Sequence, residues 1–196
     1  MKLNIKAMVD IVFKKLFGST EHPKVTLAFL NAILEKLGLE HVQTLVVENP
    51  YMLSDFQGEK EIVVDILARD EKERNYQIEM QVSSHSGLAQ RMVYGFARLF
   101  AGQLPKGQDY LSLKRSLSIW ILDTPFLQEG WIEAYIMTGT TSRKALYQEG
   151  LIVVIDLPAW RKLTHGLRFC QLRINWILKS CRKFFNRMNS RRLLKS

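Results

Sequence analysis

The sequence predicts an α/β protein in which helices flank a mixed β-sheet. Two observations support this class: helical patterns open the chain and recur between strand-like runs, and two of those runs are joined by a short turn as a hairpin. The length of 196 residues fits one domain with a sizeable core, and a hydrophobic content of 47% is ordinary for a globular protein.

The N-terminal elements are predicted to be two helices and a strand. Residues 10–17 form a short helix, and residues 22–37 form a longer one with Pro23 in its first turn and Gly38 at its C-cap. Residues 42–47 follow as a strand. The apolar stripe of the longer helix consists of Leu27, Leu30, Ile33, Leu34 and Leu37.

A β-hairpin comes next, from strand-like runs at residues 61–68 and 75–82 that flank the turn-prone, charged residues 69–74. Successive side chains of a strand point to opposite faces, so alternation fixes which residues share a face. A register in which paired residue numbers sum to 144 gives one wholly apolar face, and a shift by two keeps that face. Its pairs are Ile62 with Val82, Val64 with Met80, Ile66 with Ile78, and Ala68 with Tyr76.

The other face of this hairpin carries candidate metal ligands. Asp65 lies opposite Glu79, and Gln81 lies opposite Val63. Opposed carboxylates have Cβ atoms about 5 Å apart and repel each other. Mg²⁺ takes oxygen ligands and accepts one or two protein carboxylates. A single strand carboxylate usually faces solvent, but Val63 and Leu67 make this face more apolar, so we predict that Asp65 and Glu79 bind a divalent metal.

A third helix and three strands complete the predicted core. Residues 87–103 form the helix, with Ser84 or Ser86 as its N-cap. Its buried face is predicted to consist of Met92, Phe96, Leu99 and Phe100. The three strands, of the buried type, lie at residues 116–122, 131–138 and 151–157.

The helix after the hairpin carries side chains suited to a phosphate group. Gln90 and Tyr94 share one face of it, and Arg91, Tyr94 and Arg98 cluster at i, i+3 and i+7. Arginine makes bidentate phosphate contacts, although each Arg alone also fits a solvated helix face. Asp10, in the first helix, either closes the metal site from the other side or is an acid favoured in a first helical turn.

The net charge of +9 is concentrated at one end of the chain. Residues 157–196 contain eleven Lys and Arg and no acid, which leaves 17 basic and 19 acidic residues in the body, a net charge of −2. This asymmetry suggests contact with nucleic acid or another anionic surface. In the first helix, Lys14 and Lys15 either touch DNA or face solvent.

Several protein classes are disfavoured by the composition. No apolar run reaches 18 residues and no secretion signal is recognised, so we predict neither a membrane span nor export. Cys170 and Cys181 are expected to be free thiols in a reducing cytoplasm. The four histidines are not at ligand spacing, which argues against zinc. A basic amphipathic tail on a membrane surface is the least favoured alternative, and a homo-oligomer stays open.

The order of Asp65, then Glu79-x-Gln81, then Gln90-x-x-x-Tyr94 resembles the PD-(D/E)XK nuclease superfamily, in the branch with a RecB-like Q-x-x-x-Y helix. More narrowly, the chain resembles the Rpn-type recombination-promoting nucleases, also called PD-(D/E)XK family transposases. Four motifs in the right order carry this resemblance, at residues 10–18, 64–68, 76–81 and 90–94.

The resemblance covers residues 8–157 and implies a restriction-endonuclease-like core with Mg²⁺-dependent DNA endonuclease activity, associated with mobile elements and recombination. It implies metal-assisted hydrolysis with Asp65 and Glu79 holding the ion and Gln81 in place of the superfamily Lys. Asp10 becomes the acid of the first motif. The residues that position DNA or the catalytic groups become Gln90 and Tyr94, with Arg91 and Arg98 beside them.

Two departures from the family pattern leave alternatives open. Gln81 is neutral, so more of the charge stabilisation falls on the metal and on Arg91. A nuclease-like domain over residues 1–157 is followed by a basic, helical tail at residues 158–196 that is unlike the family. The tail is either a DNA-binding appendage or the product of a frameshift or truncation. The alternative function is a catalytically inactive DNA-binding or interaction protein that retains the fold.

Overall fold

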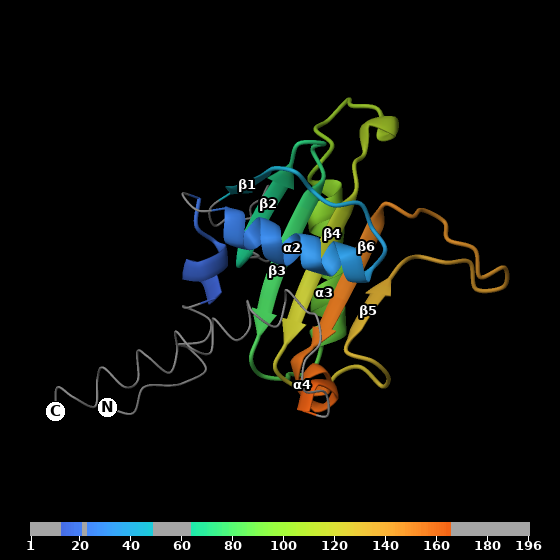
Figure 1. Ribbon diagram of the computed structural model, residues 1–196. Coiled ribbons are helices and arrows are strands. Elements are labelled where there is room, and N and C mark those ends of the chain that lie inside the picture. The colour runs from blue at the N-terminus through green and yellow to red at the C-terminus, as the bar shows by residue number, and fades with distance from the viewer. Residues whose placement is uncertain (1–12, 21–22, 49–63, 166–196) are drawn as a thin grey trace.

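A computed structural model describes residues 13–20, 23–48 and 64–165 of the chain. Within these ranges, six strands form one sheet with helices on both faces (Figure 1), which confirms the predicted α/β class and the mixed sheet. The strands are β1 (Leu45–Glu48), β2 (Ile66–Asp70), β3 (Asn75–Gln81), β4 (Ser116–Leu122), β5 (Ile132–Tyr135) and β6 (Gly150–Asp156). The labelled helices are α2 (Lys24–Lys36), α3 (Leu88–Ala101) and α4 (Leu157–His165), with a 3₁₀ turn η1 (Tyr110–Ser112). Residues 13–17 are also helical.

The sheet combines an antiparallel half with a parallel centre, in the order β1-β2-β3-β4-β6-β5. Strands β1, β2 and β3 are antiparallel neighbours, whereas β3, β4 and β6 run parallel and β5 returns antiparallel to β6. A parallel pair needs a long crossover, and α3 provides it between β3 and β4. All seven residues of β4 are buried, as expected for a central strand covered on both faces.

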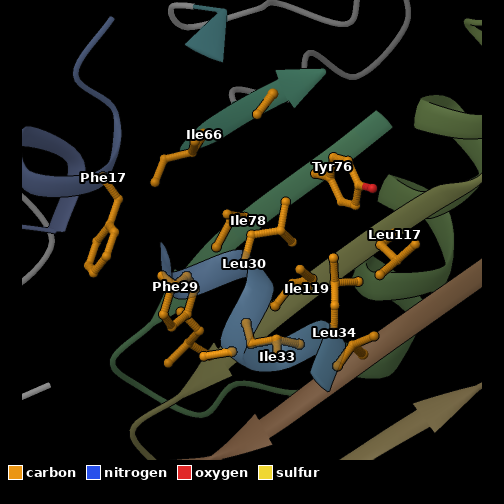
Figure 2. Close-up of a cluster of buried hydrophobic side chains, with 14 of the residues drawn as sticks. Phe17, Phe29, Leu30, Ile33, Leu34, Ile66, Tyr76, Ile78, Leu117 and Ile119 are labelled. Carbon is orange, nitrogen blue, oxygen red and sulfur yellow. The ribbon is translucent and has the colours of Figure 1, made fainter. Parts of the chain in front are cut away.

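Helix α2 covers one face of the sheet with a largely apolar interface (Figure 2). Phe29, Leu30, Ile33 and Leu34 of the helix are each at most 1% exposed. They pack on alternate residues of the strands, of which Ile66, Tyr76, Ile78, Leu117 and Ile119 are labelled in Figure 2. The predicted stripe is confirmed at Leu30, Ile33 and Leu34, which are buried, and Leu27 and Leu37 pack partly buried against the same cluster. Phe29, which was not predicted, is buried as well.

Helix α3 covers the opposite face, where the packing is smaller and partly polar (Figure 1). Its buried residues are Leu88, Met92, Gly95 and Leu99. Phe96 and Phe100, predicted on the buried face, are only half-buried and stack with ring centroids 5.7 Å apart. The predicted serine N-cap was wrong: Gly87 caps the helix in the left-handed region at φ 84°, without a side-chain hydrogen bond.

The chain turns directly from β6 into α4, and Asp156 holds this junction. Its carboxylate accepts hydrogen bonds from the backbone N of Ala159 at 2.8 Å and of Phe126 at 2.7 Å. These donors lower the pKa of Asp156, although burial acts in the opposite direction and is the largest single influence. Trp160 is buried, so the first part of the predicted basic tail packs on the body.

Strand β5 differs from its prediction in length and in burial. It spans four residues rather than eight, and its side chains alternate between half-buried and exposed because it lies at the edge of the sheet. Among the described residues, no helix is long and apolar enough to cross a membrane.

Candidate functional site

The predicted register of the β2–β3 hairpin is confirmed. Ile66 pairs with Ile78 and Ala68 pairs with Tyr76, and all four side chains are buried against α2. The pairs expected at Ile62 and Val63 lie outside the described residues. Val64 departs from the expected face, because it packs with Leu67 and Leu99 on the α3 side.

Asp65 lies one residue before β2 rather than inside the strand, and its two carboxylate oxygens have different partners. Oδ2 accepts a hydrogen bond from the backbone N of Met80 at 3.0 Å, and Oδ1 lies 2.9 Å from Nζ of Lys14. The backbone N of Asp65 donates to Oε1 of Glu79 at 3.3 Å. Side-chain acceptors therefore take the place of the strand-to-strand ladder here, which explains why β2 begins only at Ile66.

Glu79 is a carboxylate buried under α3, with its side chain 3% exposed. Oε1 accepts hydrogen bonds from Nε2 of Gln77 at 3.1 Å and from the backbone N of Asp65. Oε2 faces Nη2 of Arg91 at 3.8 Å. Burial, and secondarily the charge of Asp65, raises the pKa of Glu79 to about 7, while Gln77 and Arg91 act in the opposite direction.

A row of buried polar side chains supports Glu79 from behind, and the sequence analysis missed it. Nε1 of Trp120 donates to Oγ of Ser118 at 2.9 Å, and that hydroxyl donates a long 3.5 Å bond to Oε1 of Gln77. Gln77 in turn donates to Glu79. The signal was present, since Gln77 lies two residues before Glu79 and must share its strand face, as Ser118 does with Trp120.

Gln81 and Arg91 form the open side of the site. Nη1 of Arg91 donates to Oε1 of Gln81 at 3.2 Å, and Nε2 of Gln81 donates to the backbone O of Ser83 at 2.8 Å. The Arg91 guanidinium also lies over the ring of Trp120, 5.5 Å from its centroid. Arg91 is 45% exposed, so its charge reaches both the buried carboxylate and solvent.

The remaining predicted residues lie on α3 or outside the described part of the chain. Helical spacing puts Tyr94 and Arg98 on the same flank of α3 as Arg91, and Tyr94 is 40% exposed. Gln90 is exposed and points further from the sheet. Asp10 lies outside the described residues, as do both cysteines.

The site therefore gathers two carboxylates and two basic side chains around one end of the hairpin. Each carboxylate has one oxygen held by protein N–H donors and another oxygen turned toward a cationic group, Lys14 for Asp65 and Arg91 for Glu79. In the described part of the chain, no group of three or more His, Cys, Asp or Glu gathers as a metal site. Two carboxylates nevertheless suit Mg²⁺, which takes its other ligands from water and phosphate.

Comparison with known families identifies one match. The family model described as PD-(D/E)XK nuclease family transposase matches residues 7–189. The matched range includes the hairpin, α3 and most of the basic residues beyond β6. No curated protein and no solved structure matches the chain.

Proposed function

Because the chain belongs to the PD-(D/E)XK nuclease family transposases, and its six-stranded mixed sheet with flanking helices is consistent with their restriction-endonuclease-like fold, we propose that it is a Mg²⁺-dependent DNA endonuclease. The reaction would be hydrolysis of a phosphodiester bond. One observation carries this proposal: Asp65 and Glu79, from the two sides of the hairpin, each hold one oxygen with protein donors and direct the other toward positive charge.

The chemistry of the two carboxylates supports a divalent cation as the group they hold. Both offer hard oxygen ligands, and their mutual repulsion contributes to the raised pKa of Glu79. When bound, a divalent ion supplies a water of lowered pKa and stabilises charge on the phosphate oxygens. Since the pKa of Glu79 is about 7, we expect this side chain to lose its proton before it can serve as a ligand.

We assign Gln81 and Arg91 to positioning beside the carboxylates. The amide of Gln81 is oriented by Arg91 and by the backbone of Ser83, so it can hold a water molecule but cannot supply positive charge. Arg91 brings that charge to the same place, and its guanidinium is kept in position by Gln81 and the ring of Trp120.

The outward flank of α3 is the surface we assign to DNA. Arg91, Tyr94 and Arg98 share this flank, where arginine suits phosphate oxygens and the tyrosine hydroxyl suits a further backbone contact. Gln90 is assigned to DNA on its position in the Q-x-x-x-Y motif, and Asp10 to the acid of the first motif. The last two assignments depend on the family resemblance alone.

The basic residues beyond β6 are proposed as an additional DNA-binding segment. Residues 166–196 contain nine Lys and Arg and no acid. Since Trp160 is buried on the body, a truncation that tests this segment should end after His165 rather than before α4. The salt dependence of DNA binding by the truncated chain tests this segment, because each phosphate contact adds roughly 0.9 to the slope of log binding constant against log salt concentration. A smaller slope than in the parent indicates a DNA-binding appendage, and an unchanged slope indicates a segment without this function.

Nicking of a supercoiled plasmid tests the enzymatic proposal. The parent chain should nick with Mg²⁺ and not with EDTA, and Asp65→Asn and Glu79→Gln should each lose at least about a hundredfold in rate. Glu133→Gln is the matched control, since Glu133 is an exposed carboxylate on the edge strand β5. Thermal unfolding should show that all variants are folded.

Equal nicking by Asp65→Asn, Glu79→Gln and the parent would refute the proposal and indicate a contaminating nuclease. A chain that binds the plasmid but does not nick it with Mg²⁺ or Mn²⁺ would support the alternative, an inactive DNA-binding protein that retains the fold. The neutral Gln81 is the residue that favours this alternative, because the superfamily position is a lysine.

A further inference from the structure

We propose that Lys14, together with Arg91, supplies the positive charge that Gln81 cannot, by placing its ammonium group on the phosphate at the bond that is cut. This inference rests on the proposed nuclease function and adds a catalytic residue to it. The observation that carries it is the contact of Nζ of Lys14 with Oδ1 of Asp65 at 2.9 Å, at one of the two carboxylates of the site.

Local packing explains why Lys14 reaches the site. Residues 13–17 are helical, and Phe13 and Phe17, four residues apart, are buried with ring centroids 4.9 Å apart. Phe17 also packs against Phe29 of α2 at 5.0 Å. These aromatic contacts fix the helical segment against the core. Lys14, which follows Phe13, is thereby directed at Asp65. The neighbouring Lys15 is exposed.

The contact differs from an ordinary surface ion pair. The side chain of Asp65 is only 9% exposed, whereas that of Lys14 is 41% exposed. The ammonium group therefore lies between a nearly buried carboxylate and solvent, where a substrate phosphate would approach. A lysine ends in a compact charge on a flexible four-carbon stem, so it can exchange a carboxylate partner for a phosphate without any movement of the backbone.

Charge balance supports the same role. Without an ion, Asp65 and Glu79 carry two negative charges when ionised, and Lys14 and Arg91 carry two positive charges. A divalent cation held by the carboxylates would compensate the same two negative charges, so that both basic side chains could turn from Asp65 and Glu79 toward a phosphate. A phosphodiester brings one negative charge to the site and gains more as a hydroxide attacks it, which the preorganised cations would stabilise.

Lys14 should also compete with the ion itself. It contacts Oδ1 of Asp65, the oxygen that Met80 does not hold, and this is the oxygen most available to a metal. Removal of the Lys14 charge should therefore make the carboxylates bind a divalent ion more tightly, even though it slows cleavage. A residue with a purely structural role would not produce these two opposite effects.

The experiment compares Lys14→Gln and Lys14→Arg with Lys15→Gln, an adjacent variant of the same chemistry. Single-turnover cleavage of a duplex is measured with Mg²⁺, and Mn²⁺ affinity is measured by calorimetry on the DNA-free protein. For Lys14→Gln we expect cleavage about a hundredfold slower and Mn²⁺ binding several-fold tighter. Lys14→Arg should recover part of the rate. Lys15→Gln should stay within about threefold of the parent in both measurements.

Several results would contradict the proposal. Cleavage by Lys14→Gln within about threefold of the parent would overturn it, as would an equal loss in Lys15→Gln, which would indicate general attraction of DNA. Thermal unfolding of Lys14→Gln shows whether a loss comes from misfolding, in which case Lys14→Arg decides. If the parent chain does not cut, the proposed function is refuted rather than the role of Lys14. In that case the Mn²⁺ affinity tests Lys14 separately, because an unchanged affinity in Lys14→Gln would show that Lys14 does not act at the carboxylates.

Discussion

The two faces of the sheet are built from the same strands but for different purposes. Along β3, Tyr76 and Ile78 point toward α2 into an apolar core, while Gln77 and Glu79 point toward α3 into a polar layer. Alternation within one strand thus separates the residues that stabilise the fold from the residues that carry the chemistry. The comparison shows that the site is part of the sheet itself rather than a loop added to it.

This separation has an energetic reason. The α2 face removes large aliphatic and aromatic side chains from water, at about 25 cal/mol per Å² of apolar surface. The α3 face instead buries a carboxylate whose ionised form is disfavoured, as the raised pKa of Glu79 indicates. The apolar α2 face therefore stabilises the fold, and the fold keeps the Glu79 carboxylate buried on the α3 face, where its negative charge favours a cation.

A cavity on the α2 face should give the largest loss of stability. Leu30 is fully buried in the centre of that face, so Leu30→Ala should lower the free energy of unfolding by about 3–4 kcal/mol. Urea unfolding in EDTA measures this loss. Leu163→Ala, at a leucine that is 52% exposed on α4, should change stability by less than about 0.5 kcal/mol. Similar losses in both variants would contradict the assignment of the α2 face as the stabilising core.

The buried carboxylate on the α3 face should make stability depend on pH. The pKa of Glu79 is about 7 in the folded protein against 4.5 for a glutamate in water, so the folded state binds the proton more tightly. The stabilisation is complete below pH 4.5 and is lost as the pH rises through 7, by up to roughly 3 kcal/mol. Glu79→Gln is the control, because it cannot titrate there.

The measurement is the free energy of unfolding of the parent minus that of Glu79→Gln, in EDTA, between pH 4.5 and 8. Carboxyl groups remote from the site titrate in both proteins and cancel in the difference. At pH 8 the variant should be the more stable of the two. An identical pH dependence of the two proteins would show that Glu79 is not held in the environment described.

The smallest expected effect comes from the support behind Glu79. Gln77→Leu removes the N–H donor to Oε1 of Glu79, so cleavage should fall about tenfold, roughly 1.4 kcal/mol. Gln77 lowers the pKa of Glu79, so its loss should move the pH–rate profile to higher pH. The control is Gln148→Leu at an exposed position, and an unmoved profile in Gln77→Leu would contradict a positioning role.

Prediction from the sequence was most accurate where one periodic pattern decides the structure. Strand β4 has the predicted bounds, and the β2–β3 register is correct because a slip by one residue would turn Ile66 and Ile78 to the wrong face. Prediction failed where side-chain hydrogen bonds replace backbone pairing between the strands. Asp65 leaves the strand because side chains replace its ladder partners, and Val64 turns toward Leu99 with it.

The sequence by itself determined the α/β class, the hairpin, and the proximity of Asp65 to Glu79, since these follow from alternation and from a short turn. Only the tertiary structure decided which cations face the two carboxylates. Lys14 and Arg91 come from helical segments on either side of the hairpin in the chain. Arg91 was a candidate from the sequence, but nothing in the local sequence distinguishes Lys14 from the exposed Lys15. Their positions depend on the packing of Phe13 and Phe17 against α2 and of α3 against Trp120, which brings distant residues within ion-pair distance.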